Sequence, residues 1–104
     1  MKPSTILKKA RKLIERGWCL NASARTKTGK VCNIFSKRAV QWCAYGAVSA
    51  VSSKHTHRPA IDMLDKAVAR TDCGIIAFND RQASSKPVLR AFDRAIALAM
   101  KEGQ

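Results

Sequence analysis

The sequence predicts an α+β fold that is mostly helical, with about four helices and a short β-hairpin between the first helix and the second. Four segments place apolar residues at helical spacing, and one segment alternates apolar and polar residues on either side of a turn signal. The 104 residues correspond to one domain, and the hydrophobic content of 46% is enough for a modest core. We therefore expect residues 1–104 to form a single compact domain.

The first predicted helix begins with Ser4 or Thr5 as its cap and runs to about Arg16. Gly17 is a typical helix stop. The apolar stripe of this helix comprises Ile6, Leu7, Ala10, Leu13 and Ile14.

A β-hairpin is predicted within residues 18–35, with its tip at Lys27–Lys30 around the turn signal Thr28-Gly29. The arm before the tip contains Leu20, Ala22 and Ala24, and the arm after it contains Val31, Cys32 and Ile34.

Three more helices follow. The second is expected from about Lys37 to Ser52 with Ser36 as its cap, the third from Ala60 to Arg70 after Pro59, and the last from Lys86 to Lys101. The apolar stripe of the second helix is predicted to include Val40, Cys43, Ala44, Ala47, Val48 and Val51.

Two polar segments are predicted as loops, residues 52–58 and 79–85. The short apolar run Ile75–Phe78 fits either a strand or a helix.

The charge of the chain is unusually positive and unevenly distributed. Lys and Arg number 20 against seven Asp and Glu, which gives a net charge of +13. Residues 1–58 hold thirteen of the basic side chains but only one acid, Glu15. A field of this size attracts nucleic acids, nucleotides, acidic proteins or anionic membranes, so we expect a polyanionic partner for the first half of the chain.

The expected ligand-binding residues come from the first helix, the hairpin and the start of the second helix. They are Lys8, Arg11, Lys12, Arg25, Lys27, Lys30, Lys37 and Arg38. Exposed aromatic candidates for base stacking are limited to Tyr45 and the two tryptophans, so contact with phosphates is better supported than reading of bases.

No segment reaches the roughly 18–20 apolar residues that span a membrane, and the N-terminus lacks the apolar stretch of a signal peptide. We therefore expect no membrane association and a cytoplasmic location, that of the host cell for a phage protein. There the four cysteines should stay reduced. No cofactor or metal is expected, because no Cys-x-x-Cys is present and His55-x-His57 is the only close pair of ligand types.

A catalytic cysteine is the enzymatic alternative. Cys19 or Cys43 would be the nucleophile, with His55 or His57 as base and Asp80 to orient it. Cys43 is predicted in the middle of a helix and Cys19 just after one, where the helix dipole disfavours a thiolate. Both cysteines are better interpreted as core residues, and Asn79-Asp80 as a turn.

Several motifs together resemble an uncharacterised family of small phage and bacterial proteins with two Trp-Cys motifs and a late aromatic-Asn-Asp motif. The motifs are Arg16-Gly17-Trp18-Cys19 with Ala22 and Ala24, Ala39-Val40-Gln41-Trp42-Cys43-Ala44 with Gly46-Ala47, Gly74 with Ala77, Phe78-Asn79-Asp80, and Phe92-Asp93-Arg94-Ala95-Ile96. The chain departs from the pattern at Phe78, where the family has Trp, and at Lys27-Thr28-Gly29, where the hairpin is usually acidic. The resemblance implies a phage or bacterial setting and no particular chemistry.

We therefore expect a non-enzymatic protein of phage type that binds nucleic acid or a phosphorylated nucleotide signal, and that could antagonise host defence. Two alternatives stay open: an inhibitor that docks on an acidic host protein, and the cysteine-dependent enzyme.

Overall fold

The computed structural model describes residues 1–53, 56–71 and 73–104, and within them the chain is mostly helical with one small antiparallel sheet. In chain order the elements are α1 (Pro3–Arg16), β1 (Ala24–Arg25), β2 (Gln41–Trp42), α2 (Ala44–Val51), α3 (His57–Ala67), the 3-10 helix η1 (Ala69–Thr71), α4 (Ile75–Asp80) and α5 (Lys86–Lys101). The predicted α+β class is confirmed, with the sheet between α1 and α2.

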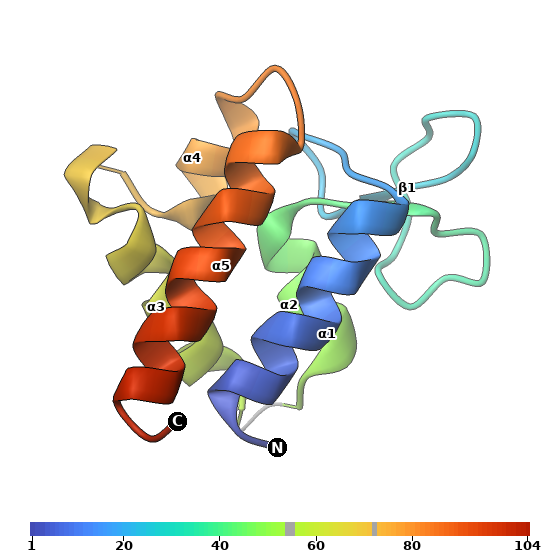
Figure 1. Cartoon of the computed structure of the whole chain (residues 1–104). Coiled ribbons are helices and arrows are strands. Elements are labelled where there is room, and N and C mark those ends of the chain that lie inside the picture. Colours follow the sequence, from blue (N-terminus) through green and yellow to red (C-terminus); the bar gives the residue numbers. More distant parts are fainter. Residues whose placement is uncertain (54–55, 72) are drawn as a thin grey trace.

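Helices α1 and α5 lie side by side in one layer, and α2 and α3 lie behind them (Figure 1). Both chain ends meet at the same end of the molecule, where the Ser4 backbone N–H donates to the Gln104 carbonyl at 3.1 Å. The largest fully buried side chains are Phe92, Ile6, Leu7, Ile14, Ile61, Leu64, Ile75, Val48, Val68, Val88 and Asn79. Asn79 is the one polar side chain in this set.

Helix α1 has the predicted end at Arg16 and the predicted apolar stripe, but it begins earlier than predicted and its predicted cap is wrong. The helix begins at Pro3, with Lys2 as the N-cap and no side-chain capping bond. Proline is favoured at this position because its missing N–H would have no partner in the first turn. Ser4, expected to cap the helix, is a buried residue inside it.

The sheet uses a different second strand from the one predicted. β1 pairs with β2, with Ala24 opposite Trp42 and Arg25 opposite Gln41. The predicted tip does form a turn, but the arm that follows it makes only one bridge, between Arg25 and Val31.

Two side chains explain why the strand after the tip does not continue. The Asn33 carboxamide oxygen accepts the Phe35 N–H at 2.8 Å, and the Ser36 hydroxyl accepts the Arg38 N–H at 3.2 Å. Such local bonds offer the backbone an alternative to a strand ladder. The chain therefore makes a second turn before it enters β2.

Helix α2 is shorter than predicted because it begins at Ala44 and not at Lys37. Ser36 caps a turn in place of the helix, and β2 occupies the residues just before α2. Cys43 is the N-cap, and its Sγ accepts the Gly46 N–H at 3.3 Å. Val40, expected in a buried helical stripe, is exposed.

The later elements follow the predictions more closely. Helix α3 begins three residues before the expected start and passes into η1, and α5 has the predicted bounds. The undecided run at Ile75 forms α4, which also includes Asn79 and Asp80, so their predicted place in a loop was wrong. Lys54 and His55 of the predicted loop 52–58 lie outside the described residues. Within the described part of the chain, no helix has both the length and the apolar character to cross a bilayer.

Candidate functional site

The segment between β1 and β2, residues 26–40, projects from the helices as two turns near the C-terminal end of α1 (Figure 1). We call it the basic loop. Its first turn is closed by the Thr26 N–H to the Lys30 carbonyl at 2.8 Å and by the Gly29 N–H to the Thr26 carbonyl at 2.9 Å. Gly29 has a φ of 87°, a region that glycine enters without a steric cost.

Arg25, one of the predicted ligand contacts, stabilises this turn through its side chain. Its guanidinium donates to the Gly29 carbonyl at 2.9 Å and to the Leu20 carbonyl at 3.2 Å. The side chain is therefore already engaged in holding the loop.

Three of the predicted contacts come together around one open hollow of about 370 Å³ on the basic loop. The residues that line it are Thr26, Lys27, Thr28, Lys30, Arg38 and Val40. Lys27, Lys30 and Arg38 are all exposed, and so is the neighbouring Lys37. None of these four cations takes part in an ion pair among the described residues. Clustered unpaired cations of this kind attract phosphate groups.

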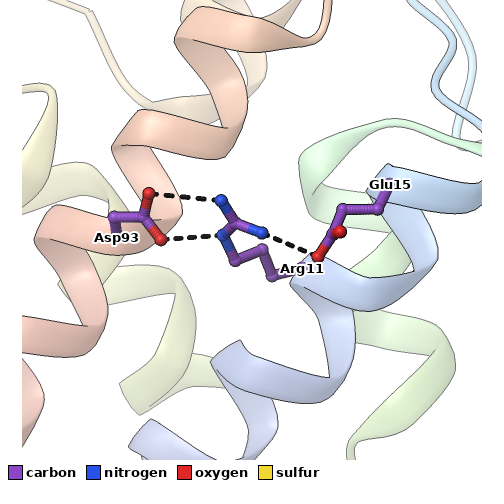
Figure 2. A network of polar contacts seen from close by, with 3 residues as sticks. All are labelled: Arg11, Glu15 and Asp93. Carbon is purple, nitrogen blue, oxygen red and sulfur yellow. Dashed lines mark hydrogen bonds and ion pairs between the residues drawn. The ribbon is translucent and has the colours of Figure 1, made fainter.

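Of the predicted contacts on α1, Arg11 forms ion pairs, whereas Lys8 and Lys12 form none among the described residues. Both lysines are exposed. Figure 2 shows Arg11 between Glu15 of the same helix and Asp93 of α5. The guanidinium bonds both Asp93 oxygens, at 2.7 and 3.2 Å, and Glu15 at 2.7 Å. These contacts, with the Asp93 hydrogen bond foremost, raise the pKa of Arg11 and link α1 to α5.

Arg11→Gln should lower the stability of the fold and should change affinity for a polyanion little, because the guanidinium is already bonded to Asp93 and Glu15. We expect a loss of about 1 kcal/mol in the free energy of unfolding, because a bidentate pair between two helices exceeds the usual surface pair only slightly. Urea denaturation measures it, with Lys12→Gln as the charge-matched control that should change stability little. Equal stability of the two variants would contradict this role for Arg11.

Asn79 of the aromatic-Asn-Asp motif bonds residues of both Trp-Cys motifs. Its side chain is fully buried, and its Oδ1 accepts the Trp18 Nε1–H at 2.8 Å and the Ala44 N–H at 3.0 Å. Its Nδ2 donates to the Cys19 carbonyl at 3.2 Å and to Asp80 Oδ1 at 3.1 Å. All four hydrogen-bonding positions of the carboxamide are occupied. Asn79 therefore clamps α4 to the first Trp-Cys motif and to the start of α2.

The family of unknown function DUF6197 matches residues 1–98. The chain belongs to the DUF6197 family. No curated protein and no solved structure matches the chain. The expected membership of an uncharacterised family is thus confirmed, and the function of this DUF6197 chain is argued from its geometry.

Cys19 and Cys43, the cysteines of the two Trp-Cys motifs of the DUF6197 chain, lie next to the residues that Asn79 bonds, and their surroundings favour the thiol form. Burial raises the pKa of Cys19 to about 11, and burial also raises the pKa of Cys43. Cys43 caps α2, so its predicted position in the middle of a helix was wrong. Both side chains are therefore protonated and weakly nucleophilic at neutral pH.

His57 is engaged elsewhere. Its Nε2 lies 2.8 Å from Ser49 Oγ, and its ring packs edge-on against the Tyr45 ring with 4.8 Å between the ring centroids. Burial lowers the pKa of His57. Within residues 1–53, 56–71 and 73–104, no group of three or more His, Cys, Asp or Glu side chains is arranged to hold a metal ion.

Among the described residues, Phe35 is the exposed aromatic residue, and the sequence did not predict it. Trp18 is half-buried against Asn79, Trp42 is 8% exposed, and Tyr45 is half-buried. Phe35, by contrast, is 70% exposed at the centre of the second turn. The signal that could have found it is its position between the turn formers Asn33 and Ser36.

A second basic hollow, also not predicted, lies between α3, η1 and α5. It measures about 600 Å³, and the cations at its edge are Lys66, Arg70, Arg94 and Lys101. Sequence reasoning passed over it because acids balance the bases of residues 59–104. Lys66 lies 3.8 Å from Glu102, and Arg94 Nε donates to the Ala67 carbonyl at 3.2 Å. Since two of its four cations are already engaged, the basic loop is the better candidate for binding a polyanion.

Proposed function

We propose that the protein binds nucleic acid without catalysing a reaction, through Lys27, Lys30, Lys37 and Arg38 of the basic loop. The observation that carries the proposal is the meeting of Lys27, Lys30 and Arg38 around one hollow, with no described acid paired to them. The exposed Lys8 and Lys12 of α1 add positive field that steers a polyanion toward the molecule.

The open form of the site supports a polymer over a single nucleotide. Small-ligand sites bury most of their ligand in a cavity, whereas the four cations of the basic loop are exposed side chains. Extended contact along a phosphate backbone needs only such an accessible row of cations.

The proposal of a binder in place of an enzyme is supported by the state of the cysteines. Raised pKa values keep Cys19 and Cys43 protonated, and the described partners of His57 are Ser49 and Tyr45. A binder of this type could act as an antagonist of host defence by sequestering a nucleic acid.

The test is the salt dependence of binding. Fluorescence anisotropy with a labelled oligothymidylate should show affinity falling as salt rises. The triple variant Lys27→Gln, Lys30→Gln and Arg38→Gln should lose about 100-fold in affinity at about 0.1 M salt. The slope of log affinity against log salt concentration should flatten by about two units, at roughly 0.7 per contact on a single strand.

A charge-matched control separates local contact from the general field. Arg81→Gln, Lys86→Gln and Arg90→Gln remove the same charge from exposed positions after α4 and at the start of α5. This control should keep the wild-type slope. The proposal is wrong if both triple variants lose affinity equally, or if wild-type affinity does not depend on salt. Capture of an acidic protein from nuclease-treated lysate, with no oligonucleotide binding, would favour the protein-directed alternative.

A further inference from the structure

We infer that the nucleic acid recognised by the basic loop is single-stranded, and that Phe35 stacks on an unpaired base. The inference rests on the proposed function and names the class of ligand. It starts from the exposure of an aromatic ring at the centre of the cationic segment.

Exposed apolar side chains concentrate on the basic loop. Among the described residues, the large exposed hydrophobic side chains are Met1, Val31, Phe35, Val40, Ile76 and Met100. Three of these six lie within residues 26–40, and Phe35, at 70%, is the most exposed. Exposed apolar groups gathered in this way mark an interaction surface.

The backbone around Phe35 is held in place by hydrogen bonds from neighbouring side chains and between backbone groups. Asn33 accepts the Phe35 N–H, and Ser36 accepts the Arg38 N–H. The Ser36 N–H bonds the Asn33 carbonyl at 3.0 Å, and the Val40 N–H bonds the Arg25 carbonyl at 3.0 Å. The ring is therefore presented on a preformed turn, which reduces the entropy lost on binding.

The combination of ring and cations selects among nucleic acids. Bases in a duplex are stacked on one another, so an exposed ring cannot reach their faces without opening the helix. Single strands offer unpaired bases to aromatic side chains while their phosphates meet nearby Lys and Arg. Phe35 lies two residues from Lys37 and three from Arg38, so both kinds of contact arise from the same turn.

The experiment compares Phe35→Ala, Phe35→Trp and the wild type on three probes: oligothymidylate, a DNA duplex and inorganic polyphosphate. Phe35→Ala should lower affinity for oligothymidylate by about five- to 150-fold, the range for losing one base–aromatic stack. Affinity for polyphosphate and the salt slope should stay unchanged, because the cations remain. Phe35→Trp should keep the affinity, and its fluorescence should be quenched by oligothymidylate. Met100→Ala, an exposed apolar residue of α5, is the matched control and should change nothing.

The outcomes separate this inference from the proposed function. If Phe35→Ala binds oligothymidylate like the wild type while the triple loop variant does not, stacking is wrong and phosphate binding stands. Equal losses for oligothymidylate and polyphosphate would also overturn stacking. If none of the three probes binds the wild type, both proposals fail.

Discussion

Asn79→Ala is expected to lower the free energy of unfolding by about 3–5 kcal/mol, since each buried polar group left without a partner costs about 1–3 kcal/mol. The substitution leaves the Trp18 indole N–H and the Ala44 N–H without their acceptor and the Cys19 carbonyl without its donor. It also opens a cavity where a fully buried side chain was. The melting temperature should fall by well over 10 °C, at about 4–8 °C per kcal/mol for a domain of this size.

Asp80→Asn is the matched control for this substitution. The new carboxamide keeps an oxygen that can accept from the Asn21 N–H and from Asn79, which Asp80 does at 2.8 and 3.1 Å. Its stability should stay within about 1 kcal/mol of the wild type. Urea denaturation of both variants measures how much the hydrogen bonds of Asn79 stabilise the fold. A loss below about 1 kcal/mol for Asn79→Ala would show that they contribute little.

Gly46→Ala should destabilise the protein by about 2–4 kcal/mol, as expected for strong overpacking, although alanine is the better helix former. A Cβ on Gly46 would lie 2.0 Å from the Ser23 carbonyl oxygen and 2.8 Å from the Ser23 carbonyl carbon. These are backbone atoms, and the same oxygen accepts the Cys43 N–H at 3.2 Å. Relief of the clash would have to move the chain that leads into β1 away from α2.

Whether Gly46→Ala lowers or raises the stability of the protein is the decisive measurement. In a helix free of such a neighbour, Gly→Ala stabilises by about 1 kcal/mol. Ala50→Gly in the same helix should cost about 1 kcal/mol or slightly more, because it loses helix propensity together with the contact of the Ala50 methyl with the core. A Gly46→Ala variant that melts at or above the wild-type temperature would contradict the close approach of Ser23.

The stability variants and the binding variants touch different parts of the molecule. Asn79 and Gly46 act at the junction of α4, α2 and β1, whereas Phe35 and the loop cations lie on exposed turns. Substitutions of Phe35 and of the four loop cations should therefore leave the melting temperature nearly unchanged. This separation allows a loss of binding to be distinguished from a loss of folding.

The site was predicted in part. Lys27 and Lys30 were expected at a turn, and the structure places them there. Arg38 was expected on the first turn of a helix, and it reaches the same hollow because Ser36 caps a turn in place of that helix. The position of Phe35 between the turn formers Asn33 and Ser36 indicates a turn, but the exposed fraction of its ring depends on which distant side chains cover it.

Sequence alone determined α1, α5 and the uneven charge of the chain. Apolar residues at helical spacing predict both helices. The charge is a sum over residues and does not depend on the fold. Tertiary structure alone decided the β1–β2 pairing and the burial of Asn79. The physical reason is distance along the chain: Asn79 bonds Trp18 from 61 residues away, and no local pattern reports such a partner.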